Sequence, residues 1–183
     1  MARDKDAIYL ELLIYRCKDN DKAAFEELIS LWEKRLFYFI RRLSQNEQDA
    51  WDVLQQVWIK LISGIEYLRN PASFPCWIYR IAYYTVVSHN RKLFNHKNVF
   101  QTIPDGASDA ETEISCAEFD NAEQVHNALT RLSIPHREVL TLFFLEDFSI
   151  EEIAKILGIP QGTVKSRMYY AKKELKKTLI IGK

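Results

Sequence analysis

The sequence contains few cysteines and no net charge. Only three cysteines, Cys17, Cys76 and Cys116, occur in 183 residues, and none belongs to a CxxC pair or a Cys/His cluster. This excludes a disulfide framework and offers no metal-ligand spacing, so we expect no metal site. Isolated thiols are typical of a reducing compartment, and we expect a cytoplasmic protein.

Signatures of membrane insertion and of catalysis are also missing. No apolar run approaches the roughly 18 residues of a membrane span, and the N-terminus lacks a signal-peptide layout. There is no glycine-rich phosphate loop and no plausible catalytic triad, and the four histidines stand alone. The sequence therefore predicts no membrane insertion, no enzyme, no cofactor and no small-molecule substrate.

Hydrophobic residues make up 48% of the chain, and most recur at helical spacing. This period predicts long amphipathic helices over residues 21–43, about 47–63 and from 74 onward, after a shorter amphipathic segment at 8–17. Residues 64–73 contain Gly, Asn and Pro and are expected to form a loop. Further helices are predicted at 121–133 and 135–146, so the fold class is all-α.

A flexible acidic linker is predicted at residues 97–120. No Lys or Arg occurs between Asn98 and Thr130, and seven acidic residues between 101 and 124 give a local charge of −7. Such a composition cannot bury enough apolar surface to fold on its own. We therefore expect two small helical domains, 1–96 and 121–183, on either side of the linker.

The strongest motif lies at residues 149–175 and predicts two helices joined by a tight turn. Ser149 and Glu152 form a capping box at the start of the first helix, and Gly158 is expected in the left-handed conformation at its end. The second helix begins near Gln161. Its buried side is predicted to carry Val164, Met168, Ala171 and Leu175.

The spacing of Ala154, Gly158 and Val164 is typical of a helix-turn-helix, a unit that places its second helix in the DNA major groove. Seven Lys or Arg residues and one Glu between Pro160 and Lys183 give a net charge of +6, which suits phosphate binding. An ordinary helical hairpin with a solvated basic face would share part of this pattern.

Two further surfaces are candidates for binding. Residues 74–91 mix aromatic rings with Arg and Lys beyond what one core needs, which suits stacking on unpaired bases; the alternative is that most rings are core. The set expected to point away from the core is Tyr79, Arg80, Tyr83, Tyr84, Val87 and Arg91. Asp49, Asp52 and Gln56 stack on adjacent helical turns, either as a binding face or as a solvated one.

Together, the two halves resemble a bacterial sigma factor of the extracytoplasmic-function group, compact sigma-70 relatives that have only regions 2 and 4. The resemblance covers about residues 20–95 and 121–177. Region 4 is matched by Leu132, Pro135 to Arg137, Glu146, Ser149, Glu152-Ile153-Ala154, Leu157-Gly158 and Gly162 to Arg167. Region 2 is matched by Asp49-Ala50, Asp52-Val53, Gln55, Trp58, Phe74, Trp77 and Arg80-Ile81-Ala82.

The resemblance implies a transcription initiation factor that binds core RNA polymerase, reads promoter DNA and is held inactive by an anti-sigma factor. The implied polymerase contacts are Asp49, Asp52, Gln55 and Gln56. The implied contacts to the −10 element are Arg69, Asn70, Trp77, Arg80, Tyr83, Tyr84 and Arg91. The implied contacts to the −35 element are Gly162, Thr163, Lys165, Ser166, Arg167, Tyr169, Tyr170 and Lys173. The acidic linker would thread polymerase channels otherwise used by nucleic acid.

The sequence departs from the family pattern at two pairs of positions. The family usually has acids where Trp51 and Gln56 stand, which makes the implied polymerase contact less acidic. It commonly has Asn and Asp at the positions of Tyr84 and Ser88, so promoter preference stays open. Two alternatives to a sigma factor stay open. One is a stand-alone helix-turn-helix regulator with a sensor or dimerisation domain, and the other is a helical adaptor with an incidental basic tail.

Overall fold

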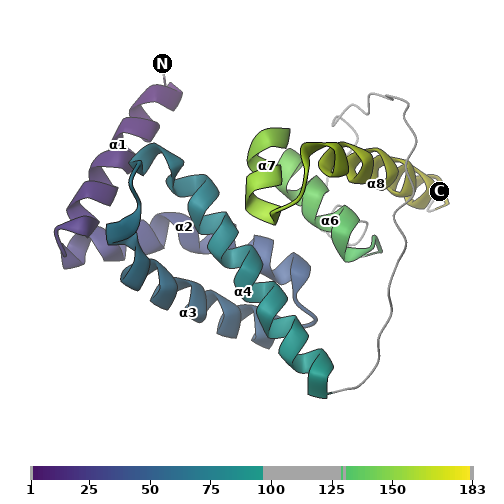
Figure 1. The fold of residues 1–183 in the computed structure, drawn as a ribbon, viewed down its shortest axis with the longest axis horizontal. Helices are drawn as coiled ribbons and strands as arrows, with labels where there is room; N and C mark the ends of the chain where they lie inside the picture. Colours follow the sequence, from purple (N-terminus) through teal and green to yellow (C-terminus); the bar gives the residue numbers. More distant parts are fainter. Residues whose placement is uncertain (1, 97–128, 130, 182–183) are drawn as a thin grey trace. The chain divides into compact units, whose positions relative to one another are not determined.

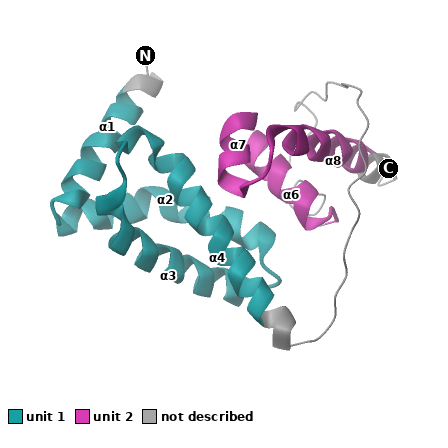
Figure 2. Cartoon of the chain, viewed as in Figure 1, with its two compact units in different colours: residues 1–96 teal, residues 97–183 magenta. Residues whose placement is uncertain are grey.

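The chain forms two compact units, Met1–His96 and Lys97–Lys183 (Figure 1, Figure 2). The computed structural model describes residues 2–96, 129 and 131–181, and these residues contain helices and no strand, which confirms the all-α prediction. Within those ranges, no helix is both long and apolar enough to cross a membrane. The predicted linker 97–120 and the start of the helix predicted at 121–133 lie outside the described residues.

Unit 1 consists of long α-helices with a short irregular connection before the last one. The helices are α1 (Ala2–Lys18), α2 (Lys22–Leu43), α3 (Glu47–Gly64) and α4 (Phe74–His96). The segment expected as a loop contains two single 3-10 turns, η1 (Ile65–Tyr67) and η2 (Pro71–Ser73). The bounds of α2, α3 and α4 follow the predicted ranges, whereas α1 begins at Ala2, before the predicted start at residue 8.

Two side chains fix where α2 and α3 begin. The Asp21 carboxylate accepts from the N–H groups of Ala23 and Ala24, and the Asn46 carbonyl oxygen accepts from the N–H of Asp49. Each cap satisfies donors that have no partner within the helix, a contribution of about 1 kcal/mol. Arg16 forms an ion pair with Asp21 at 2.7 Å, and this hydrogen-bonded guanidinium lowers the pKa of the carboxyl.

An aromatic cluster forms the centre of the unit 1 core. The Trp32 ring meets Phe74 and Tyr79 edge-on, with centroids 5.2 Å and 6.3 Å apart, and Phe39 meets Tyr79 at 5.1 Å. Tyr79 is fully buried, so the expectation that it points away from the core with Arg80 is wrong. Because α4 packs against both α2 and α3, it buries a wider arc than a single apolar stripe.

Unit 2 contains α6 (Ile134–Leu140), a π-helical turn η4 (Thr141–Leu145), α7 (Ile150–Leu157) and α8 (Gln161–Ile181). The prediction of one α-helix over 135–146 is wrong in its second half, where the backbone widens to the π form. Residues 131–133 are not helical, which corrects the end of the helix predicted at 121–133.

The connection between α7 and α8 has the predicted chemistry. The Ser149 hydroxyl accepts from the N–H of Glu152, and the Glu152 carboxylate accepts from the N–H of Ser149, which confirms the capping box. Gly158 has φ 70° and ψ 33°, the left-handed conformation that residues with a Cβ adopt only with strain. Its N–H donates to the carbonyl of Ala154 at 2.9 Å and closes α7.

Candidate functional site

The α7–α8 pair of unit 2 has the form of a helix-turn-helix with one face of α8 buried. Val164, Met168 and Ala171 are buried as predicted, and Leu175 is half-buried. The buried face fixes which side of α8 remains accessible. The residues implied for DNA contact divide into exposed Gly162, Lys165 and Lys173, and half-buried Thr163, Ser166, Arg167, Tyr169 and Tyr170.

The accessible side of α8 presents a basic row. Lys165, Tyr169 and Lys173 follow at intervals of four residues, so they lie above one another on the helix. The Tyr169 ring meets Tyr170 edge-on at 5.3 Å, and the Ser166 hydroxyl donates to the carbonyl of Thr163 at 3.1 Å. Two exposed cations on either side of an aromatic ring form a surface that fits the phosphates and base edges of a groove.

Arg167 does not lie on this accessible side, although the resemblance implied that it contacts the −35 element. Its Nη1 donates to Oε1 of Glu138 on α6 at 3.1 Å, and the exposed side-chain fractions are 23% for Arg167 and 4% for Glu138. Lys172 also turns toward the body of the unit, with its Nζ 5.4 Å from the centroid of Phe144. Arg167 therefore ties the second helix of the motif to α6.

A second half-buried cation, Arg137, supports α6 itself. Arg137 Nε donates to the carbonyl of Leu129 at 2.9 Å, and its Nη2 donates to the carbonyl of Leu132 at 2.9 Å. Burial lowers the pKa of this guanidinium, which nonetheless stays charged. A further contact joins His136 Nδ1 to the carboxylate of Glu174 at 2.7 Å, so α6 is attached to α8 at two points along their length.

In unit 1, the residues implied for the −10 element lie on the η1–η2 connection and on α4. Arg69 and Asn70 are exposed, and the Asn70 side-chain oxygen accepts from the N–H of Ala72 at 3.1 Å. Tyr83 is half-buried and meets the exposed Tyr84 edge-on at 5.4 Å. Arg91 is exposed further along the same helix.

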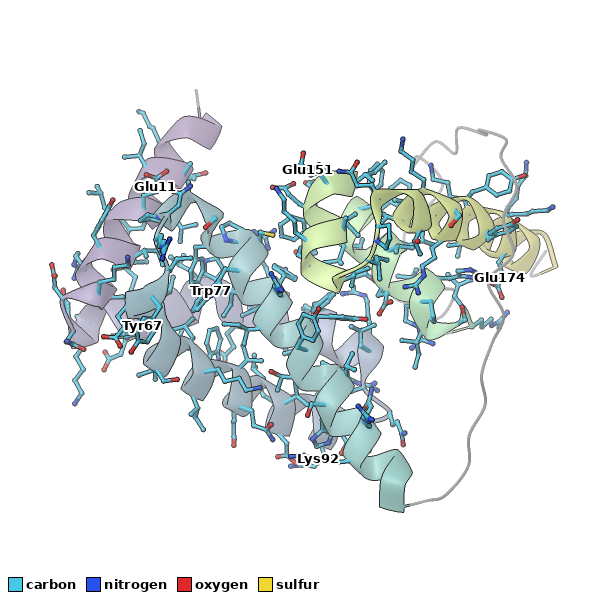
Figure 3. All side chains as sticks on the ribbon, in the orientation of Figure 1. Glu11, Tyr67, Trp77, Lys92, Glu151 and Glu174 are labelled. Carbon is cyan, nitrogen blue, oxygen red and sulfur yellow. The ribbon has the colours of Figure 1, made fainter. Side chains whose placement is uncertain are left out.

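Trp77, labelled in Figure 3, is half-buried and held in a fixed position on α4. Its ring centroid lies 6.0 Å from that of Phe74, and a Cβ placed on Gly64 would lie 3.3 Å from its Cζ2 atom. The alternative that most rings of this segment are core is therefore only partly right for Trp77. One side of the ring packs against α3, while the residue retains an accessible edge.

That edge lines a hollow of about 360 Å³ whose walls come from α3 and α4. Its lining residues are Lys60, Trp77, Arg80, Ile81 and Tyr84. Lys60 was not among the residues implied for DNA contact. The pattern carries no direct signal for it, because the meeting of Lys60 with residues 77–84 depends on how α3 and α4 cross.

The residues implied for polymerase contact do not form one uniform surface. Asp52, Gln55 and Gln56 are exposed on α3, as predicted. Asp49 is instead held within the unit: the Asn46 amide donates to its Oδ2 at 2.8 Å, and His89 Nε2 lies 3.5 Å from its Oδ1. Trp51 is 39% exposed beside Asp52, and its ring stacks on Phe37 with centroids 4.1 Å apart.

Two family models match the chain, one in each unit. The model for sigma-70 region 2 matches residues 28–93, and the model for sigma-70 region 4 matches residues 122–175. Among similar proteins, the RNA polymerase sigma factor SigV of Bacillus subtilis is 30% identical over 156 residues, which cover 85% of this chain and 91% of SigV. The RNA polymerase sigma-H factor of Pseudomonas aeruginosa is 28% identical, with 91% of this chain and 92% of the relative covered.

Solved structures show the same fold. The sigma factor RpoE of Bartonella quintana, solved in complex with the anti-sigma factor NepR, has a TM-score of 0.68 and 25% identity, covering 87% of this chain and 98% of that one. CnrH, solved with the cytosolic domain of CnrY, also has a TM-score of 0.68. At 19% identity over 95% of this chain and 99% of CnrH, that second likeness concerns the fold alone.

Proposed function

The chain belongs to the sigma-70 family of transcription initiation factors, in its extracytoplasmic-function group, and from this membership we propose how its two units divide the work. As a sigma factor, it binds core RNA polymerase and directs it to promoters. Residues 1–96 bind the polymerase and the −10 element, and residues 121–183 bind the −35 element. The chain supplies recognition, while the polymerase supplies the chemistry.

Unit 2 binds the −35 element through the accessible side of α8. Lys165 and Lys173 contact phosphates, and the N-terminal turn with Gly162, Thr163 and Ser166 reaches base edges in the major groove. Tyr169 and Tyr170 pack against the sugar–phosphate backbone between the two lysines. The ion pair of Arg167 with Glu138 supports this assignment, because it holds α8 at a fixed angle to α6.

Unit 1 reads the non-template strand of the −10 element once the duplex is open. Bases lifted from the stack need rings to stack on and polar groups at their edges, and unstacking costs about a few kcal/mol per base. Trp77, Tyr83 and Tyr84 supply rings on α4. Arg69 and Asn70 on the preceding connection, with Arg80 and Arg91 on α4, contact the strand's phosphates and base edges.

The exposed polar residues of α3 form the contact with core polymerase. Asp52, Gln55 and Gln56 make the direct contacts, and Asp49 positions the start of α3 through its bond to Asn46. The ring of Trp51 adds an apolar contact beside them. An anti-sigma factor is the second protein partner, by analogy with the RpoE–NepR complex of Bartonella quintana, and both partners meet the chain in the cytoplasm.

The observation that carries the proposal is the pair of family matches, one in each unit, over residues 28–93 and 122–175. The test is a pull-down with purified core RNA polymerase, followed by run-off transcription from a promoter library with and without the protein. Stoichiometric binding and new promoter-specific transcripts are expected. Retention of duplex DNA by the protein alone, without polymerase binding, would favour a stand-alone helix-turn-helix regulator.

The polymerase contact has a test of its own. Asp52→Lys reverses a charge on the exposed face of α3 and should weaken binding to core polymerase at least tenfold, because like charges would then meet across the contact. Glu26→Lys is the matched control, since it makes the same change at an exposed position of α2. Equal affinities for the two variants would remove the assignment of this face.

A further inference from the structure

The connection between α3 and α4 is packed against α1, which contacts both of its 3-10 turns, η1 and η2 (Figure 1). Its apolar residues Ile65, Leu68 and Pro71 recur every three positions and are all buried. Arg69 and Asn70 stand between the last two of these anchors and are exposed. The placement of the two polar side chains therefore depends on what holds the anchors beside them.

Lys18, the last residue of α1, reaches this connection with its side chain. Its Nζ donates to the carbonyl of Leu68, a residue 50 positions further along the chain. Within η1, the N–H of Leu68 donates to the carbonyl of Ile65 at 3.2 Å. Within η2, the N–H of Ser73 donates to the carbonyl of Asn70 at 3.0 Å. The Leu68 carbonyl thus lies between the two turns, and Lys18 gives it a donor from another helix.

The end of α1 that carries Lys18 is itself fixed to the start of α2. Arg16 forms the ion pair with Asp21 at 2.7 Å, and its Nη1 lies 3.6 Å from the carboxylate of Glu27. The N–H of Asp21 donates to the carbonyl of Arg16 at 3.1 Å. Lys18 is half-buried, so its aliphatic stem packs on the unit while its ammonium group reaches the carbonyl. The connection is therefore tied to a corner that does not move independently of α2.

From these contacts we propose that Lys18 is a positioning residue for −10 recognition, which holds Arg69 and Asn70 in place through the carbonyl of Leu68. This inference rests on the proposed function, in which those two residues contact the strand. It adds a residue of α1 that acts through the connection rather than on the DNA. The match to sigma-70 region 2 begins at residue 28, so α1 lies before the matched segment.

The size of the effect follows from the bond that is lost. Lys18→Met keeps an unbranched apolar stem and removes the ammonium group, so the Leu68 carbonyl loses its charged donor. The connection then has to be ordered when the strand binds, and this ordering weakens binding. Loss of a hydrogen bond to a charged group predicts about tenfold weaker binding of the −10 strand. Lys18→Arg keeps a charged donor at this position and should restore most of the affinity.

The test uses holoenzyme assembled from the full chain and core polymerase. A promoter library first supplies the preferred −10 sequence, and a labelled single-stranded oligonucleotide of its non-template strand then serves as the probe. Lys18→Met should bind this probe about tenfold more weakly, while its affinities for core polymerase and for a −35 duplex stay at the wild-type values. Lys5→Met is the matched control, because it makes the same change at an exposed position of α1 and should bind as the wild type does.

A double-mutant cycle separates positioning from a general loss of stability. Asn70→Ala removes a side chain that Lys18 is proposed to position, so adding Lys18→Met should weaken binding by less than the product of the two single effects. Hydrogen exchange supplies a readout without DNA. In Lys18→Met the amides of Leu68, Ala72 and Ser73 should exchange about tenfold faster, while those of α3 keep their rates.

The outcomes separate this inference from the function on which it rests. If Asn70→Ala weakens probe binding and Lys18→Met does not, the positioning role is wrong and the −10 assignment of the connection stands. Multiplying effects in the cycle, weaker core binding by Lys18→Met, or an equal defect in Lys5→Met would also overturn the role. If wild-type holoenzyme gave no promoter-specific transcripts, the proposed function would fall, and the inference with it.

Discussion

Replacing Arg167 by alanine should destabilise unit 2 rather than simply remove a DNA contact. In the structure, Arg167 Nη1 lies 3.1 Å from Oε1 of Glu138, a residue 29 positions earlier on a different helix. The Glu138 side chain is only 4% exposed, so solvent cannot replace the lost cation fully. The substitution therefore leaves a carboxylate largely inside the protein with less compensation.

The size of the effect follows from burial. Breaking a fully buried ion pair by removing one partner costs roughly 3–5 kcal/mol. Arg167 is 23% exposed and Glu138 has a further interaction, so we expect a smaller loss, about 2 kcal/mol in the free energy of unfolding of unit 2. In a domain of this size, that loss lowers the midpoint of thermal unfolding by roughly 8–16 °C.

The chain offers a convenient way to measure this unit separately. All four tryptophans, at positions 32, 51, 58 and 77, lie in unit 1. Loss of helical circular dichroism without a change in tryptophan emission therefore reports the unfolding of unit 2. Arg167→Ala should move that transition and leave the tryptophan transition where it is in the wild type.

A double-mutant cycle and one control decide the interpretation. Arg167→Met combined with Glu138→Leu should recover most of the stability that either change alone loses, since removing both charges removes the buried carboxylate. Lys165→Ala is the control on the same helix: it should weaken −35 binding without lowering the midpoint. Wild-type stability of Arg167→Ala, or additive effects in the cycle, would refute the reasoning.

Three other predictions concern the backbone and pH. Gly162→Ala should stabilise α8 by up to about 1 kcal/mol in thermal unfolding, because a Cβ there meets nothing within 4 Å. The same change should weaken duplex binding by holoenzyme, because the added methyl group holds the first turn of α8 away from the −35 DNA. Gly158→Ala should cost about 1–2 kcal/mol in urea unfolding, because φ is 70° there, and Gly158→Asn should cost less. Burial raises the pKa of Cys17 from 9.0 to about 11. The unfolded thiol therefore ionises first as pH rises, so unit 1 should lose up to about 2 kcal/mol between pH 9 and 11, and Cys17→Ala should flatten this slope in tryptophan-monitored unfolding.

Much of the helix-turn-helix could be predicted from the sequence because its determinants are local. The capping box joins residues three apart, the turn needs one residue at φ 70°, and the buried side of α8 repeats at helical spacing. Helical spacing of apolar residues likewise predicted the long helices of unit 1 and the all-α fold class. Each of these features depends on backbone geometry within one or two turns, which a short stretch of sequence fully specifies.

The direction of individual side chains was decided by tertiary structure. Periodicity placed Arg167, Tyr79 and Asp49 on outward faces, yet each contacts a different helix: Arg167 pairs with Glu138, Tyr79 packs on Trp32, and Asp49 lies near His89. Lys60 lines the hollow between α3 and α4, where its Nζ donates to the hydroxyl of Thr85, a residue 25 positions away. A helical period reports the average apolar side of one helix. The crossing angles between helices arise only when the helices pack. These angles decide how much of one helix its neighbours cover, and therefore which polar residues at the edge of the apolar side become buried.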